Sequence, residues 1–161
     1  MNRDSIRARF EEFLRARSLR LTPQRRAIFE RVFDTHQHFT AEELFGWIKD
    51  DGGRGSRATV YRTLALLVEG GFLETLDVGQ GELHYEHVLG HKHHDHMVCV
   101  VCGRIEEFVD ERIEALQEEA CRAKGFEMES HNLRLFGRCK TCRRRRRPRS
   151  EKGGSKSAGK P

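Results

Sequence analysis

Several features of other protein classes are missing from these 161 residues, and each absence narrows the range of functions. No apolar run is long enough to cross a bilayer, so we expect no membrane partner. The first ten residues, MNRDSIRARF, have no apolar segment typical of a secretory signal, so we expect a cytoplasmic protein. The metallohydrolase motif His-Glu-x-x-His is also absent, which favours a protein that is not an enzyme.

Cysteine is missing from the first 98 residues and then occurs five times, at Cys99, Cys102, Cys121, Cys139 and Cys142. Four of these form two Cys-x-x-Cys pairs that are separated by 36 residues. Thiols stay reduced in the cytosol, where such pairs favour a metal ion over a disulfide. The spacing therefore predicts a closed tetrahedral site for structural Zn²⁺. Two unrelated thiol pairs and a redox pair are the alternatives, and Cys121 is expected to pack in a core.

The net charge of +5 hides three unlike segments. Residues 1–70 carry a net charge of +3, residues 71–142 carry −6, and residues 143–161 carry +8. A basic first half suits phosphates, whereas an acidic, histidine-rich second half suits cations. The last segment is charged and of low complexity, so we expect a disordered basic tail over 143–161. Such a tail either adds non-specific attraction to DNA or is only solvated.

Apolar spacing and helix caps predict four helices followed by a hairpin in the first half of the chain. The helices are expected over 4–18, 23–33, 41–49 and 57–69, with Thr22, Thr40 and Ser56 as N-caps. Strands over 72–77 and 83–87 follow, joined by the turn Gly79-Gln80-Gly81. Compact helices, a helix with a basic N-terminal end and then a hairpin predict a winged helix-turn-helix, which places one helix in the major groove of DNA.

The second half is expected to alternate strands with one helix. A strand over 104–109 precedes a helix that begins after Asp110 and runs to about Lys124. Its apolar residues Ile113, Leu116 and Ala120 are predicted to be buried. A third strand is predicted over 126–136, with a bulge at Ser130-His131 that re-aims the imidazole.

The run from His91 to Gly103, HKHHDHMVCVVCG, concentrates potential metal ligands. If it is extended, His94 and His96 point to one side and His93 and Asp95 to the other, so that one strand feeds two metal sites. Imidazoles need carboxylates or further imidazoles to complete a site for a borderline divalent metal. Sequence proximity offers the following candidates, among which the pattern does not choose: Glu86, Glu106, Glu107, Glu114 and His131.

Three segments resemble the ferric uptake regulator family of bacterial metal-dependent repressors. They are Ala58-Thr59-Val60-Tyr61-Arg62, His93-His94-Asp95-His96 followed by Cys99-Val100-Val101-Cys102-Gly103, and the closing Cys139-x-x-Cys142. The resemblance covers residues 5–142 and implies an α+β fold. A winged-helix DNA-binding domain is expected over 1–87 and a small α/β metal-binding and dimerisation domain over 88–142. It also implies a homodimer that binds a double-stranded DNA operator and controls metal uptake genes.

The resemblance further implies roles for individual residues. The sensing site between the domains is expected to comprise His38, Glu86, His94, His96 and Glu107. A second site is expected to comprise His93, Asp95, Glu114 and His131. Structural zinc is expected on the four paired cysteines, and DNA contacts are expected from Arg57, Thr59, Tyr61 and Arg62.

The sensed metal is expected to be Fe²⁺, with Mn²⁺ as the nearest alternative. Peroxide-sensing relatives tend to have aspartates in the sensing site, whereas the matching residues here are Glu86 and Glu107. Zinc sensors often use an additional cysteine near the hinge, and none occurs before Cys99. Outside this family, the alternatives are a zinc-dependent hydrolase and a purely structural zinc module.

Overall fold

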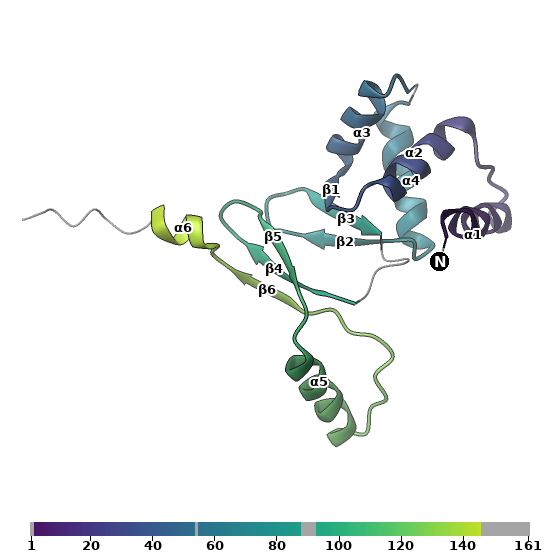
Figure 1. The fold of residues 1–161 in the computed structure, drawn as a ribbon. Coiled ribbons are helices and arrows are strands. Elements are labelled where there is room, and N and C mark those ends of the chain that lie inside the picture. Colours follow the sequence, from purple (N-terminus) through teal and green to yellow (C-terminus); the bar gives the residue numbers. More distant parts are fainter. Residues whose placement is uncertain (1, 54, 88–92, 146–161) are drawn as a thin grey trace, which may run out of the picture.

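The computed structural model describes residues 2–53, 55–87 and 93–145, which form two successive α+β units (Figure 1). A helical unit with a three-stranded sheet comes first, and a smaller unit with a second three-stranded sheet follows. The predicted fold class, a winged helix-turn-helix followed by a small α/β unit, is confirmed. His91 and the predicted tail from residue 146 onward lie outside the described residues. No helix among the described residues is long and apolar enough to span a membrane.

Three of the four helices of the first unit begin after their predicted caps Thr22, Thr40 and Ser56, whereas the first begins one residue before the predicted Asp4. The four helices are α1 (Arg3–Ala16), α2 (Pro23–Asp34), α3 (Ala41–Asp50) and α4 (Arg57–Glu69). The side chain of Thr22 accepts a hydrogen bond from the backbone of Arg25 at the start of α2. Thr40 and Glu43 form a reciprocal capping box at the start of α3. These local bonds satisfy backbone N–H groups that the first helical turn leaves unpaired.

The core of the first unit is built around aromatic side chains. Phe10 is fully buried, and its ring centroid lies 5.5 Å from that of Phe29 and 5.3 Å from that of Phe72. Val60, Leu64 and other apolar residues of α1 to α4 complete the same cluster. Since this core joins all four helices to the first sheet, it fixes how α4 is presented on the surface.

The first sheet has the strand order β1-β3-β2, with antiparallel pairing throughout. Strands β2 (Leu73–Asp77) and β3 (Leu83–His87) form the predicted hairpin. Strand β1 (Phe39–Thr40) was not predicted, because two residues are too few to show a strand periodicity.

The second sheet has the strand order β5-β4-β6. Its strands are β4 (Asp95–Cys99), β5 (Ile105–Phe108) and β6 (Arg134–Gly137). The prediction of a continuous third strand over 126–136 was wrong, because the parallel pairing of β6 with β4 begins only at Arg134 opposite His96. His131 therefore lies in the irregular segment before β6, not at a bulge within a strand. Helix α6 (Lys140–Arg145) was also not predicted, and it places the first three residues of the predicted basic tail in a helix.

The two units touch through a small apolar cluster. Leu76 and Val78, from β2 and the residue after it, pack with Val98 of β4, and Ile105 of β5 closes the cluster. Beside it, Arg134 donates a 2.7 Å hydrogen bond to the backbone carbonyl of Thr75. The first unit is thus attached to the second by contacts that need no ligand.

Helix α5 (Glu111–Ala123) departs from prediction in its surroundings. We expected Ile113, Leu116 and Ala120 to be buried, but no residue of α5 is buried within the chain, and Leu116 is 64% exposed. In Figure 1 the helix lies apart from the other labelled elements, below the second sheet. Its amphipathic pattern is present, but the described part of the chain offers no surface that covers it.

Replacing Phe10 by alanine should lower the free energy of unfolding by about 3 to 5 kcal/mol, because a fully buried ring leaves a cavity when it is removed. Urea denaturation measures the change. Leu83→Ala is the control, since Leu83 is 47% exposed and should cost less than about 1 kcal/mol. Similar losses in the two variants would contradict the assigned core.

Candidate metal centres

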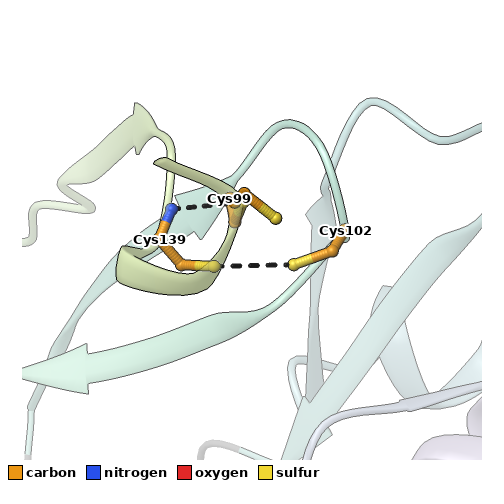
Figure 2. A group of neighbouring side chains, drawn as sticks. Cys99, Cys102 and Cys139 are labelled. Carbon is orange, nitrogen blue, oxygen red and sulfur yellow. Dashed lines mark hydrogen bonds between the residues drawn. The ribbon is translucent and has the colours of Figure 1, made fainter. Parts of the chain in front are cut away.

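Four cysteines converge at the end of the second sheet (Figure 2, which labels three of them). Their sulfur atoms all lie within 4.8 Å of one another, and those of Cys102 and Cys139 are 3.8 Å apart. A tetrahedral zinc site with bonds of about 2.3 Å separates neighbouring sulfur atoms by about 3.8 Å. The four cysteines are free of disulfide bonds, and the positions of their sulfur atoms fit the predicted zinc site.

Local backbone geometry brings these thiols together. Cys99 is the last residue of β4, and Cys102 lies in the turn to β5. Cys139 directly precedes α6, and Cys142 lies in its first turn. Gly103, with a φ of 71°, takes the left-handed conformation that closes this turn. The cluster thus holds α6 against the turn between β4 and β5, which accounts for a helix where an arginine-rich sequence gives no apolar periodicity.

The electrostatics of the four thiols favour a cation. Backbone N–H groups of Cys139, Val101 and Cys102 lower the pKa of the Cys99 thiol to about 6, which favours the thiolate. Hydrogen bonding to Cys102, followed by burial, raises the pKa of the Cys142 thiol to about 12. Four adjacent thiols cannot all ionise without compensating positive charge, and a divalent metal supplies that charge.

A second cluster lies at the junction of the two units and contains His38, Glu86, His94 and His96, four of the five predicted sensing residues. The Nε2 atoms of His38 and His96 are 3.1 Å apart. The Glu86 carboxylate lies 3.2 Å from His38, 3.0 Å from His94 and 3.2 Å from His96. Ligand atoms bound at about 2.0 to 2.2 Å to one cation are separated by similar distances.

Glu107, the fifth predicted sensing residue, lies at the rim of this cluster. Its carboxylate is 3.7 Å from the His38 ring and 3.9 Å from the His94 ring, and its side chain is half exposed. The neighbouring candidate Glu106 is outside the cluster and pairs with Arg104 at 2.6 Å. The alternation of strand β5 separates the two glutamates.

The state of the Glu86 carboxyl is set by its surroundings. Burial by itself would raise its pKa, but hydrogen bonds and charge from His38 and His96 hold the pKa well below its usual range. Glu86 is therefore a carboxylate with imidazole nitrogens from three directions, one of them from the first unit and two from the second. Such a set of nitrogen and oxygen donors suits Fe²⁺, Mn²⁺ or Zn²⁺.

A third cluster lies between β4, α5 and the segment before β6, and it contains His93, Asp95, Glu114 and His131. His93 lies 3.3 Å from Asp95, and His131 lies 2.9 Å from Glu114. Asp95 is only 1% exposed, and its Oδ2 atom has no hydrogen-bond partner among the described residues. A buried carboxylate with an unpaired oxygen is costly unless a cation balances it, so this set also fits a metal ion.

The four predicted DNA-contacting residues lie on the N-terminal half of α4. Arg57, Tyr61 and Arg62 are exposed, whereas Thr59 is partly buried, with its hydroxyl 3.0 Å from that of the cap Ser56. One partner was missed by sequence reasoning: Glu42 of α3 contacts both Arg57 and Tyr61. Glu42 precedes Arg57 by 15 positions and Tyr61 by 19 positions and lies on a different helix, so no local sequence pattern indicates these contacts.

The junction cluster borders a small hollow. This hollow has a volume of about 10 Å³, roughly the space that one water molecule needs. Its lining residues are His36, Gln37, His38, Glu86, His87, His94 and Glu107. A hydrolytic site needs an open metal position next to space for a substrate. The hollow at this cluster provides little such space.

Known proteins resemble this chain in sequence and in fold. The model of the Ferric uptake regulator family matches residues 16–136. The Ferric uptake regulation protein of Campylobacter jejuni is 36% identical over 142 residues, covering 86% of this chain and 89% of that protein. A Helicobacter pylori ferric uptake regulator structure, reported to reveal three functional metal binding sites, has a TM-score of 0.79 at 29% identity and covers 89% and 95% of the two chains. A Pseudomonas aeruginosa structure with manganese has a TM-score of 0.69 at 34% identity and covers 79% and 95%.

Replacing Cys102 by serine should reduce tightly bound zinc from about one ion per chain to nearly none, because three thiolates hold zinc less well than four. The free energy of unfolding should fall by at least about 3 kcal/mol, since metal binding is coupled to folding. Elemental analysis after dialysis and urea denaturation measure the two effects. Cys121→Ser is the matched control, because Cys121 is outside the cluster and should leave zinc content unchanged. Full zinc in the Cys102 variant would refute the site.

Proposed function

The chain belongs to the ferric uptake regulator family, and we propose that it is a metal-responsive transcriptional repressor that binds operator DNA when its junction site holds Fe²⁺. We assign the winged-helix DNA-binding domain to residues 1–87 and the metal-binding and dimerisation domain to residues 88–142. The family function, metal-dependent regulation, requires metal occupancy to change the position of the DNA-binding helix. The junction cluster is the feature of this chain that meets that requirement.

One observation carries the proposal: the junction cluster draws its residues from both domains. His38 and Glu86 come from the first domain, and His94 and His96 come from the second. A cation bound there supplies the positive charge that holds the four side chains at one point. Without that charge, the partly buried Glu86 carboxylate is balanced only where a neighbouring imidazole is protonated, so the domain angle is less well fixed.

Fe²⁺ is the proposed regulatory metal, with Mn²⁺ second. The donors are imidazole nitrogens and carboxylate oxygens, and no thiolate lies in the junction cluster. Soft thiolates favour zinc or copper, whereas a mixed set of histidine and carboxylate accommodates Fe²⁺ and Mn²⁺. Glu107 is proposed as the fifth ligand, since its carboxylate is within 3.7 to 3.9 Å of two cluster rings. Structural Zn²⁺ is assigned to the four cysteines.

The third cluster is proposed as a second metal site of the C-terminal domain. It ties α5 to β4, because Glu114 belongs to the helix and Asp95 to the strand. Few other contacts attach α5 within the chain, so a cation there would stabilise the position of the helix. A merely stabilising role and a regulatory role are both consistent with this placement.

DNA recognition is assigned to α4, whose exposed N-terminal half carries Arg57, Tyr61 and Arg62. The second helix of a helix-turn-helix enters the major groove with its N-terminal residues. Two such helices in a symmetric dimer would contact two half-sites of a double-stranded operator. Because operators are chromosomal, the proposed location is the bacterial cytoplasm.

A second copy of this chain is the proposed partner of the C-terminal domain. Met97 of β4 and Leu135 of β6 are paired across neighbouring strands, and they are 43% and 42% exposed. Leu116 of α5 and Phe126 after it add further exposed apolar surface. Apolar residues of this kind on a sheet face and on a helix without a cover are typical of homodimer interfaces.

Replacing His38 by alanine should leave zinc content and dimer mass unchanged but weaken metal-dependent operator binding by roughly 10- to 100-fold, in the range of typical coupling between sites. Fluorescence anisotropy with a labelled operator duplex, at fixed salt and with or without Mn²⁺ or anaerobic Fe²⁺, measures this. His84→Ala is the control, because His84 lies on β3 two residues from Glu86 but outside every cluster. A full metal response of the His38 variant would refute the junction site.

Replacing Met97 by glutamate should convert the dimer to a monomer, because a charge would have to be buried within the apolar interface. Light scattering after gel filtration reports the mass, and elemental analysis should still find zinc. Leu83→Glu introduces the same charge at a similarly exposed residue of the first domain and should not alter the mass. A Met97 variant that stays dimeric would place the interface elsewhere.

A further inference from the structure

A charged contact links the two helices of the helix-turn-helix. The Glu42 carboxylate of α3 accepts hydrogen bonds from Nε of Arg57 at 2.9 and 3.2 Å, one to each oxygen. The Tyr61 hydroxyl donates to the same carboxylate at 3.4 Å. Arg57 and Tyr61 are one turn apart on α4, so a single carboxylate of α3 contacts two residues proposed to face DNA.

Glu42 takes no part in the capping box of the helix to which it belongs. The capping box of α3 is made by Thr40 and Glu43, and the Glu42 side chain is not part of it. Helix α4 begins with Arg57 and has no acidic residue in its first turn, which the helix dipole disfavours. Glu42 therefore supplies, from a neighbouring helix, the negative charge that this end of α4 lacks.

The contact holds the Arg57 side chain from two sides. Its guanidinium carbon lies 4.8 Å from the centre of the Phe45 ring, and Phe45 lies one turn after Glu42 on α3. Only Nε is used by Glu42, and within the described chain neither Nη1 nor Nη2 of Arg57 has a hydrogen-bond partner. An arginine fixed in this way presents its two Nη nitrogens, with four N–H donors, at a reduced cost in conformational entropy.

We propose that Glu42 is a specificity-determining residue of the DNA interface, which positions Arg57 for base edges and keeps its guanidinium from pairing with phosphates of any sequence. The proposal rests on the proposed function, because it takes Arg57 and Tyr61 as DNA contacts. A freed arginine pairs with any phosphate, and this attraction carries no sequence information. An arginine held by a carboxylate contributes mainly where its remaining donors meet a suitable base, such as guanine.

The test compares Glu42→Gln with the wild type on two DNA duplexes. One duplex is selected from a random pool by the Mn²⁺-loaded wild-type protein, and the other is a scrambled sequence of the same composition. Glu42→Gln should lower the ratio of the two affinities roughly tenfold, the scale of one bidentate base contact. On the scrambled duplex, the slope of log affinity against log salt should steepen by about one, because one more cation engages phosphate.

Glu69→Gln is the matched control. Glu69 pairs with Arg17 at 2.8 Å, and it lies at the opposite end of the same helix α4. The Glu69→Gln substitution removes one carboxylate from an arginine pair that lies away from the proposed interface. The affinity ratio of this variant should therefore equal that of the wild type. In an Arg57→Gln background, Glu42→Gln should produce no further change in the ratio, because the effect acts through Arg57.

Two results would overturn the proposal. Glu42→Gln would have a wild-type affinity ratio, with or without a lowered melting temperature, if the pair only stabilised the fold. Equal shifts in Glu42→Gln and Glu69→Gln would reveal a general effect of net charge. Failure of the proposed function is distinguishable from both, because the wild-type protein would then enrich no sequence from the random pool with Mn²⁺, and the inference would fall with it.

Discussion

The Glu86 carboxylate, which contacts three imidazoles from two units of the fold, is the constraint on which the proposed metal response of this chain depends. Buried charges must be balanced, and here the side chains that balance Glu86 belong to different parts of the fold. His38 is also close to the DNA-binding elements in the chain. Phe39 after it is buried in the core, Thr40 caps α3, and α3 packs against α4. We therefore expect a displacement at the junction to reach α4, the proposed recognition helix, through Phe39, Thr40 and α3.

The domain junction combines two kinds of contact with different requirements. The apolar cluster of Leu76, Val78, Val98 and Ile105 needs no ligand, whereas the histidine and glutamate cluster needs a cation to balance its charge. Metal binding at the proposed junction site would act on a contact that already exists, which fits the modest coupling energies of about 1 to 3 kcal/mol that are typical of allosteric proteins. A junction without the apolar cluster would require the metal to order two free domains, at a larger cost in entropy.

Local rules predicted much of this fold and of the metal ligands' arrangement. Caps at Thr22, Thr40 and Ser56 predicted three helix starts, and the alternation of a strand predicted that His94 and His96 separate from His93 and Asp95. Features that depend on distant partners could not be predicted. Helix α5 has no residue buried by the described part of the chain, β6 is limited by its pairing with β4, and the contact of Glu42 with Arg57 joins two helices. The four-cysteine cluster was predictable from spacing alone, whereas the two histidine and carboxylate clusters were predictable only through the family resemblance, because spacing does not choose among nearby carboxylates.

Linkage between metal and DNA is the central claim, and its most direct test is reciprocity. Titration of the zinc-loaded dimer with Mn²⁺, in the absence and presence of a saturating operator duplex, gives two metal affinities. If both ligands favour the same domain arrangement, DNA must tighten Mn²⁺ binding by the same factor by which Mn²⁺ tightens DNA binding, about 5- to 150-fold. Equal Mn²⁺ affinities with and without the duplex would contradict the account, because the junction site would then be uncoupled from the recognition helix.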